Sequence, residues 1–442
     1  MFERKTTGVF LPLWLIFLAA QACTGSDHAG ENDDTINLAE IPVPPPDGPK
    51  LASINKSTPI LERPSPTAPV IGTMRAGETV ARAKEPISKT QCPGGWYPIH
   101  PRGFVCAGPD ATTNLAHPTL QVMKTLPARE APLPYRYFST TKATSLFEWD
   151  RSKPNAVREV GKLRRRSRVA VVGSWSAQTP QGANTNLAML PDGRYVAADH
   201  LEESSTPTFK GTVLDDKTKL PIAFVVKQGI RSWTAEAKSA TRGDPIEPQT
   251  MVPLTGRFRT LAGVQFWATP TDTYVRHPDV TVVRRRDTFP DFVKPDQKWI
   301  DVSVITGTFV LYEGKKPVYA TLCSVGMDRL GNPETGPTTQ MGTFEITAKH
   351  LSTSEAGSKP FAEDHEVFDA PWVHLMSSGQ MIHGAIWHSR FGVEHGPGNV
   401  QLSPADAAYL FAWTSPVLPE GWHSVLTPAD ASDSKVIVHI RK

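Results

Sequence analysis

Between Met381 and Phe411 the sequence specifies its local structure closely. Three histidines fall within thirteen residues and are followed by two glycine breaks, the second being Gly-Pro-Gly at 396–398. A helix is predicted directly afterwards, because Ser403 suits the N-cap, Pro404 suits the first turn and an acidic residue follows three positions after the cap. A glycine loop that leads into a helix N-terminus presents backbone N–H groups to an anion or oxyanion. The segment therefore predicts a binding or catalytic loop followed by a helix.

The composition favours β structure with many turns over a helical bundle. The 442 residues include 41 prolines and 32 glycines, and 8% of them are aromatic. A chain of this length forms about two to four domains. The net charge of +3 gives no strong field for nucleic acid, so no nucleic-acid partner is expected. Metal-ligand spacings such as C-x-x-C or H-E-x-x-H and phosphate-binding loops do not occur, so neither a metal nor a cofactor is predicted.

Residues 1–23 are predicted to be an export signal. Two basic residues precede a short apolar stretch at 9–20, which is too short to span a membrane. Small residues before Cys23 resemble a bacterial lipobox, so Cys23 is predicted to carry a lipid; cleavage near Ala22 without lipidation is the alternative. The polar and then proline-rich stretch at 24–50 is predicted to be a tether. The protein is therefore expected to be exported and anchored in the periplasm or cell envelope.

Residues 51–110 are predicted to form a small β domain. Short strands, glycine turns and a Gly-Trp-Tyr run at 95–97 resemble a bacterial SH3-like domain, a module that often docks wall glycopeptide. Cys92 and Cys106 lie in this domain. Because an exported chain meets oxidising conditions, they are predicted to form a disulfide that adds about 3 kcal/mol by loop entropy. Whether the domain binds a ligand or only packs and spaces is left open.

Residues 111–294 are predicted to contain one or two small β modules. Strand-like runs occur at 169–173 and 222–226, and no internal repeat is evident. Basic runs at 164–166 and 284–286 lie beside β-branched stretches, so they are predicted to be solvated strand edges. A weak attraction of these runs to anionic wall polymers is left open.

The last third of the chain carries a series of short motifs in a particular order. They are WIDV at 299–302, TQMGTF at 339–344, HG at 383–384, WH at 387–388, FG at 391–392 and SPADAA at 403–408. Their order and spacing make residues 295–430 similar to the L,D-transpeptidase (YkuD) catalytic domain, a family of cysteine enzymes that cross-link peptidoglycan. The resemblance implies a YkuD-like β-sandwich with one short helix after the active-site loop, and a polar segment at 349–366 where active members often place a lid.

A final strand is predicted at 431–442. The chain as a whole is thus predicted to be mainly β. It would comprise a small SH3-like β-barrel, the middle β module or modules and the YkuD-like sandwich.

The departure from the family lies at the nucleophile. In members with this spacing the nucleophilic cysteine lies sixteen residues after the first histidine, and sixteen residues after His383 the chain has Asn399. An amide has neither the nucleophilicity of a thiolate nor a titration that a neighbouring base could use. The resemblance therefore implies the fold without an intact catalytic set. The family-equivalent positions are His383, Gly384, Pro397, Gly398, Asn399 and Gln401, where the family has Arg or Asn at the last.

The remaining cleft is predicted to bind rather than to catalyse. His383 is either a relic of the catalytic base or a satisfied histidine at a strand end. Together with Gly398 and Asn399 it would form a binding site, because backbone N–H groups there still suit a carbonyl or carboxylate. The first functional hypothesis is an inactive lipoprotein that binds peptidoglycan stem peptides or a cell-wall enzyme.

Two other functions remain open. The first is an active transpeptidase with a rearranged nucleophile. Cys323 is the main candidate for it, although its apolar run favours a buried residue, and His395 is the other. The second is a structural envelope spacer, in which the β modules only separate the last domain from the anchor.

Overall fold

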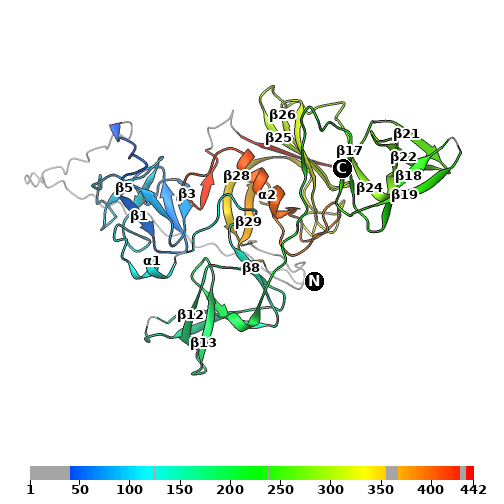
Figure 1. Ribbon diagram of the computed structural model, residues 1–442. Helices are drawn as coiled ribbons and strands as arrows, with labels where there is room; N and C mark the ends of the chain where they lie inside the picture. Colours follow the sequence, from blue (N-terminus) through cyan, green and yellow to red (C-terminus); the bar gives the residue numbers. More distant parts are fainter. Residues whose placement is uncertain (1–39, 124, 151, 237, 355–366, 429–434) are drawn as a thin grey trace, which may run out of the picture. The chain divides into compact units, whose positions relative to one another are not determined.

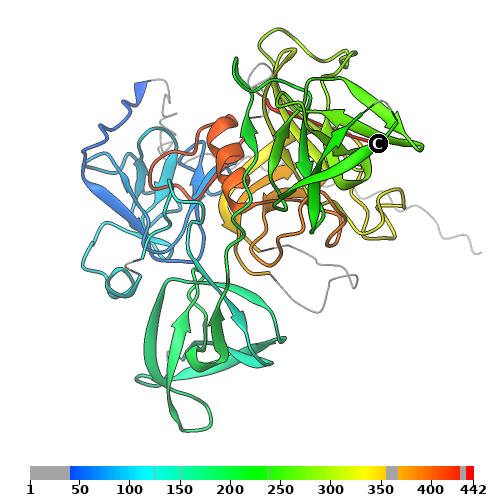
Figure 2. The same cartoon turned by 45° about the vertical axis from the view of Figure 1, so that its right-hand side comes forward.

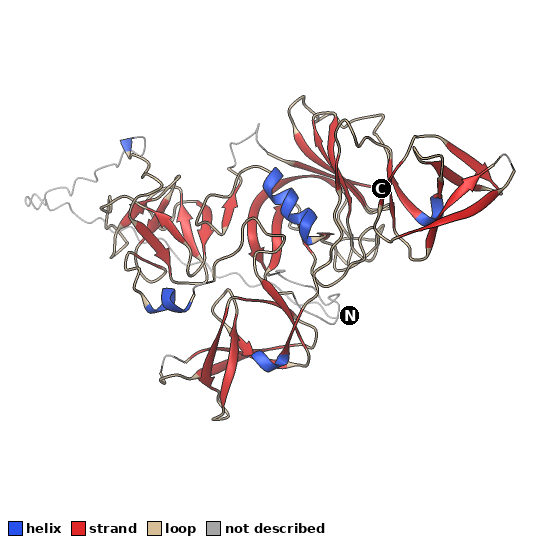
Figure 3. Cartoon of the chain, in the orientation of Figure 1, coloured by secondary structure: helices blue, strands red, loops and turns tan. Residues whose placement is uncertain are grey.

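The computed structural model describes residues 40–123, 125–150, 152–236, 238–354, 367–428 and 435–442. The predicted export signal, the lipidation site Cys23 and most of the predicted tether lie outside these residues. The chain divides into two compact units, 1–41 and 42–442, and almost all described residues belong to the second. Strands dominate and helices are few and short (Figure 3), which confirms the mainly β class. Within the described ranges, no helix has the length and apolar character to cross a membrane.

The first module consists of a small sheet, with strand order β4-β1-β7, and of the strands β3-β2-β6-β5, which form one end of a 14-stranded sheet because β3 pairs with β32 of the C-terminal domain. Leu51, Ile60 and Val105 fill the space between the sheets and are fully buried. The predicted disulfide between Cys92 and Cys106 is present. The strands are β1 (Lys50–Ser53), β2 (Thr58–Leu61), β3 (Val70–Met74), β4 (Thr79–Ala81), β5 (Trp96–Pro98), β6 (Phe104–Cys106) and β7 (Ala111–Thr112), and the short helix α1 (Pro118–Val122) follows them.

Two further β modules occupy the middle of the chain. The strands of the second module are β8 (Arg136–Thr140), β9 (Thr144–Trp149), β10 (Val157–Leu163), β11 (Arg168–Val171), β12 (Gly173–Gln178), β13 (Asn184–Met189), β14 (Tyr195–Ala197) and β15 (Leu201–Glu203). Those of the third are β17 (Ile222–Val225), β18 (Ile230–Ala235), β19 (Ala240–Ile246), β20 (Met251–Pro253), β21 (Phe258–Leu261), β22 (Val264–Ala268), β23 (Tyr274–Arg276) and β24 (Val280–Val283). In each module a 3-10 turn, η2 (Ala198–His200) or η3 (His277–Asp279), precedes the last strand.

These two modules repeat one topology, and the first module shares it. Their small sheets have the orders β11-β8-β15 and β20-β17-β24, and their larger sheets have the orders β10-β9-β14-β13-β12 and β19-β18-β23-β22-β21. Without the extra edge strands β12 and β21, both match the first module strand for strand. In the second module a bridge between Ala156 and Gln178 links the two ends of the larger sheet, whose strands Figure 2 shows curling round. A repeat that is not evident in the sequence is therefore present in the strand topology.

The C-terminal domain is built around the long strand β28 (Gly342–Thr353). Its first residues pair with β33, and its later residues pair with β29 and β32. Strand β28 therefore connects the part of the sheet that contains β33 to the part that contains β29 and β32. The other elements are β16 (Thr212–Val213), β25 (Lys298–Ser303), β26 (Thr308–Glu313), β27 (Lys316–Leu322), β29 (Ala370–Met376), β30 (Met381–Gly384), β31 (Val400–Leu402), α2 (Pro404–Trp413), β32 (Ser424–Leu426) and β33 (Ile437–Arg441). Figure 1 shows β28, β29 and α2 together in this domain.

Helix α2 is fixed by polar contacts at both ends. Ser403 caps its N-terminus by accepting the N–H of Asp406, as the sequence predicts, at 3.1 Å. The Asp406 carboxylate accepts from the Tyr319 hydroxyl at 2.6 Å, which ties the helix to β27. At the C-terminal end, Lys349 Nζ donates to the carbonyls of Phe411, Thr414 and Pro416 at 2.7, 2.8 and 2.9 Å. These bonds satisfy carbonyls that a helix end leaves without partners.

The prediction of a polar segment at 349–366 is wrong for its first residues. Residues 349–353 continue β28, and Lys349 is fully buried, with its ammonium group bonded to carbonyls at the end of α2. Most of the rest of that segment, 355–366, lies outside the described residues.

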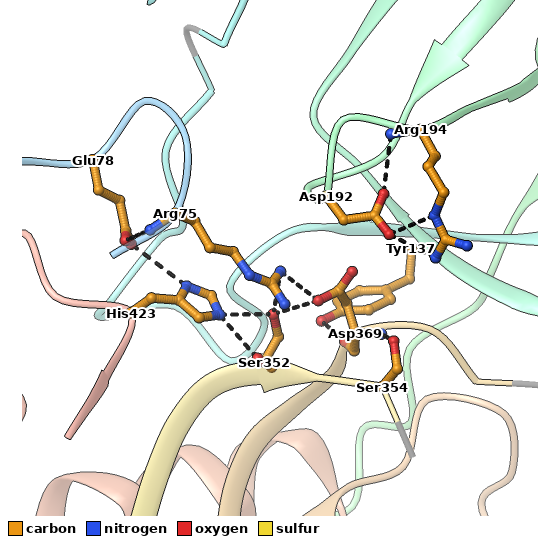
Figure 4. A network of polar contacts seen from close by, with 9 residues as sticks. All are labelled: Arg75, Glu78, Tyr137, Asp192, Arg194, Ser352, Ser354, Asp369 and His423. Carbon is orange, nitrogen blue, oxygen red and sulfur yellow. Dashed lines mark hydrogen bonds and ion pairs between the residues drawn. The ribbon is translucent and has the colours of Figure 1, made fainter. Parts of the chain in front are cut away.

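A buried polar network, which we call the junction network, joins the first two modules to the C-terminal domain (Figure 4). Arg75 of the first module forms an ion pair with Asp369, and Ser352 donates to the same carboxylate at 3.0 Å. The Tyr137 hydroxyl of the second module donates to the Asp369 backbone carbonyl at 2.7 Å. Burial alone lowers the pKa of Arg75, but the adjacent Asp369 charge raises it overall, so the guanidinium stays charged.

Candidate functional site

Strands β30 and β31 bring together residues that lie far apart in the predicted loop. They run parallel and pair His383 with Gln401 and Gly384 with Leu402. His383 and Gln401 are both buried. The His383 Nδ1 atom lies 3.1 Å from the Gly384 carbonyl oxygen, which it meets as a donor. The structure therefore places the histidine directly beside the strand that follows position 399.

Asn399, at the position of the family nucleophile, acts as a hydrogen-bond acceptor. Its Oδ1 atom accepts the backbone N–H of Met381 at 3.0 Å, so the amide is directed back toward β30. The side chain thereby ties the start of β30 to the residue that precedes β31. No side chain from Pro397 to Gln401 ionises near neutral pH.

The turn before Asn399 is held by a threonine from another strand connection. Thr339 Oγ1 donates to the Gly398 carbonyl and accepts the Gly326 N–H, both at 2.8 Å. Gly398 has φ of +102°, and a Cβ atom there would lie 2.7 Å from the Thr338 carbonyl oxygen. Only glycine fits this position without displacing backbone. The glycine that remains from the family motif thus has a clear steric role.

His388 forms the polar centre of the site, although the sequence marked it only as part of the Trp-His motif. Its Nε2 lies 2.7 Å from Gln401 Oε1, and its Nδ1 accepts the Arg390 N–H at 3.1 Å. These partners fit the neutral ring that carries its proton on Nε2. The His395 ring lies beside it, with centroids 4.0 Å apart. Burial, reinforced by His395, lowers the pKa of His388 to about 3.

The pairing of His388 with Gln401 was not foreseeable from either residue alone. The Trp-His spacing marked His388 as a family feature, but its partner became visible only once β30 and β31 were paired. His395, considered as an alternative nucleophile, also has a lowered pKa because of burial. Among the residues in the described ranges, no three His, Cys, Asp or Glu side chains gather as a metal site.

Cys323 is poorly suited to act as a replacement nucleophile. It is fully buried in the core of the C-terminal domain, beside residues of the main sheet such as Phe309 and Tyr319. Burial raises the pKa of its thiol to about 12. Because the thiolate is the nucleophile, this environment opposes reaction at neutral pH.

A cleft of about 540 Å³ opens beside His388, and the predicted binding residues His383, Gly398 and Asn399 are not among the residues that line it. The residues Ile386 to Ser389 form one wall, and Arg168 and residues 202–208 from the second module and its following segment form another. Gln249 of the third module also lines it and donates through Nε2 to the Ser389 carbonyl. The lining includes both an aromatic ring, Trp387, and charged or hydroxyl groups, which suits a peptide better than a purely apolar ligand.

A match to a protein family identifies the C-terminal domain. The family model of the L,D-transpeptidase catalytic domain, YkuD, matches residues 297–438. The comparison with curated proteins gave no match. Residues 297–438 therefore form a YkuD domain, while the other modules have no such assignment.

Solved structures of L,D-transpeptidases are similar to this chain. The enzyme from Xylanimonas cellulosilytica is 16% identical with a TM-score of 0.23, and the match covers 35% of this chain and 64% of that one. L,D-transpeptidase 1 of Mycobacterium tuberculosis is 17% identical with a TM-score of 0.23, over 54% of this chain and 98% of that one. An L,D-transpeptidase in complex with imipenem is 16% identical with a TM-score of 0.25, and the match covers 54% of this chain and 94% of that one. The chain thus spans less than two thirds of the Xylanimonas protein.

Proposed function

We propose that this protein is an exported, catalytically inactive L,D-transpeptidase-like protein that binds peptidoglycan stem peptides or a cell-wall enzyme. The observation that carries the proposal is the side chain of Asn399. It stands at the nucleophile position and uses its carbonyl oxygen to accept the Met381 N–H. An amide in that role holds the loop in shape but cannot form an acyl intermediate.

The cleft beside His388 supports a binding role. Stem peptides carry carboxylates and amides, and the cleft offers Arg168, the serine and threonine hydroxyls of residues 204–208 and the carboxylates of Glu202 and Glu203, of which Glu203 is paired with Arg136. The Arg168 guanidinium donates from Nη1 to the Arg166 carbonyl at 2.8 Å, and no carboxylate pairs with it among the described residues. A carboxylate ligand would therefore find a cation whose charge is not yet neutralised.

The binding test uses purified sacculi and a synthetic stem tetrapeptide. We expect the mature chain to sediment with sacculi and to bind the tetrapeptide in a calorimetric titration. Arg168→Gln should weaken tetrapeptide binding about tenfold, the loss typical of one charged hydrogen bond. Arg164→Gln is the matched control, because Arg164 is exposed, lies in the same turn region and does not line the cleft. Absence of both sedimentation and tetrapeptide binding would exclude the peptidoglycan ligand.

A structural spacer is the second candidate function, and the three modules of shared topology favour it. We infer that all three are SH3-like, which extends the assignment made for residues 51–110 to both modules of 111–294. Together with a lipid on Cys23, they would hold the YkuD domain at a distance from the membrane. Deleting residues 222–283, which removes the third module and leaves β16 and the cleft wall at 204–208 in place, should leave wall binding intact if that module only spaces, and reduce it if the module helps to form the cleft.

A further inference from the structure

The second basic run of the sequence, Arg284 to Arg286, lines a cavity of about 820 Å³ between the third module and the C-terminal domain. One side is formed by the end of β24 and the segment after it. The other is formed by β25, β26 and the loop between them. Arg329 and Arg441 complete a lining of five arginines against the two carboxylates of Asp287 and Asp301. The run predicted to be a solvated strand edge therefore faces a concave surface.

The buried carboxylate of this cavity is shared between two arginines. Arg286 Nη1 lies 2.6 Å from Asp301 Oδ1, while Arg441 donates through Nε to Oδ1 at 3.0 Å and through Nη2 to Oδ2 at 2.9 Å. The Asp301 side chain is only 4% exposed. One negative charge thus balances two positive charges, and a net positive charge remains at the base of the cavity.

Arg284 and Arg285 add charge at the rim. The Arg284 guanidinium carbon lies 4.8 Å from the centre of the Trp267 ring, a contact that orders the group. A guanidinium stacked in this way keeps the N–H groups of its edge available for a bidentate contact. Within the described residues, neither arginine forms an ion pair with a carboxylate. Arg329, in contrast, is paired with Glu394 at 2.9 Å.

The neutral groups of the cavity suit an oxyanion as well. Ser303, Thr306 and Thr308 line it, and the hydroxyls of the two threonines lie 2.9 Å apart. Hydroxyls and arginine forks are the donors that protein sites use for phosphate oxygens. A volume of about 820 Å³ exceeds the needs of a single small anion, so a ligand with several charged oxygens fits better.

We propose that this cavity is a second binding site, separate from the cleft at His388, which takes a phosphate-bearing polyanion. The phosphate groups would lie across Arg284 and Arg285 and reach the excess charge of the Asp301 cluster. The same chemistry occurs in a soluble phosphate polymer and in the headgroups of an anionic membrane. The site does not depend on the inactivity of the YkuD domain or on its stem-peptide cleft.

The test measures binding of two probes to the mature chain without its lipid. The soluble probe is tripolyphosphate, titrated by calorimetry at low and moderate salt. The surface probe is a vesicle that contains phosphatidylglycerol, compared with one of phosphatidylcholine alone in a flotation assay. The variant is Arg284→Gln with Arg285→Gln. Its matched control is Arg164→Gln with Arg165→Gln, which removes the same charge from exposed residues of the second module.

The proposal predicts at least a tenfold loss of affinity in the first double variant and less than a twofold change in the second. The first variant should also show a shallower dependence of affinity on salt, since it has fewer charged contacts with phosphate. Loss with tripolyphosphate supports a soluble polymer as the ligand, and loss with anionic vesicles alone supports a membrane headgroup. Equal losses in both double variants, or no binding of either probe by the unchanged protein, would overturn the proposal.

Discussion

The loop at Asn399 and the junction network at Asp369 are both buried and polar, yet they differ in charge. The loop holds its shape with a neutral histidine, His388, and with the amides of Asn399 and Gln401. The junction network holds a fully charged pair, Arg75 with Asp369, inside the protein. Charge is thus concentrated where modules meet and avoided where the family's chemistry takes place. Neutral groups of this kind are consistent with the proposed binding role.

Breaking the junction pair should have the largest effect on stability. Arg75→Ala leaves the buried Asp369 carboxylate without its cation, which we expect to cost about 3–5 kcal/mol of unfolding free energy. Urea denaturation measures this loss. Arg136→Ala is the control, since its pair with Glu203 is exposed and the change should leave the urea midpoint almost unmoved. Similar midpoints in the two variants would show that the junction network does not hold the modules together.

The buried ammonium of Lys349 should have the next largest effect. Lys349→Met keeps an apolar stem but removes the ammonium donor from three carbonyls at and just after the end of α2, of which, among the described residues, only that of Phe411 keeps a bond, from the Thr414 hydroxyl at 3.4 Å; we expect a loss of about 1–3 kcal/mol.

Lys349 should also produce a pH dependence. Burial lowers the pKa of Lys349 to about 7, against about 10.4 in an unfolded chain. The unfolded state then binds the extra proton between these values, so wild-type stability should rise with pH through this window. The Lys349→Met variant should lack that rise, and an identical pH profile in both proteins would contradict the assignment.

The neutral His388 ring should make unfolding stability depend on pH in the acidic range, and this effect should be the smallest of those predicted. Because the pKa of His388 is lowered to about 3, against about 6.5 in an unfolded chain, only the unfolded state takes up this proton between those values. Wild-type stability should therefore fall as pH falls through the window, and His388→Gln should reduce that slope. In NMR spectra the His388 ring proton should keep its shift between pH 5 and 8. A shift with a midpoint near 6.5 would show that the ring is solvated and chargeable.

Much of the C-terminal domain could be predicted because its signals are local. The cap at Ser403 and the glycine at 398 are dictated by neighbouring backbone, and the order of the motifs gave the domain its family. The pairing of His388 with Gln401 depends instead on the parallel register of β30 and β31, which no local pattern specifies. The burial of Lys349 was likewise not specified by a local pattern. A lysine in a polar stretch is expected to be exposed to solvent, and its burial is explained only by the carbonyl groups at the end of α2.

The repeated topology was missed for a different reason. The modules share strand order, but their loops and strand lengths differ, so no fixed period remains in the sequence. The residual signal is an aromatic residue followed by a buried valine in the penultimate strand. It occurs as Phe104-Val105, Tyr195-Val196 and Tyr274-Val275, and the three valines are almost fully buried. Two residues per module are too few to detect a repeat.

We expect the YkuD domain to keep its cleft and to lack reactive side chains at positions 397 and 399. Intact-mass spectrometry after incubation with a carbapenem such as imipenem tests this expectation most directly. The unchanged protein should show no added mass, and the double variant Pro397→His with Asn399→Cys should gain a single covalent adduct. An adduct on the unchanged protein, lost in Cys323→Ala, would contradict the account and identify a working enzyme with a relocated nucleophile.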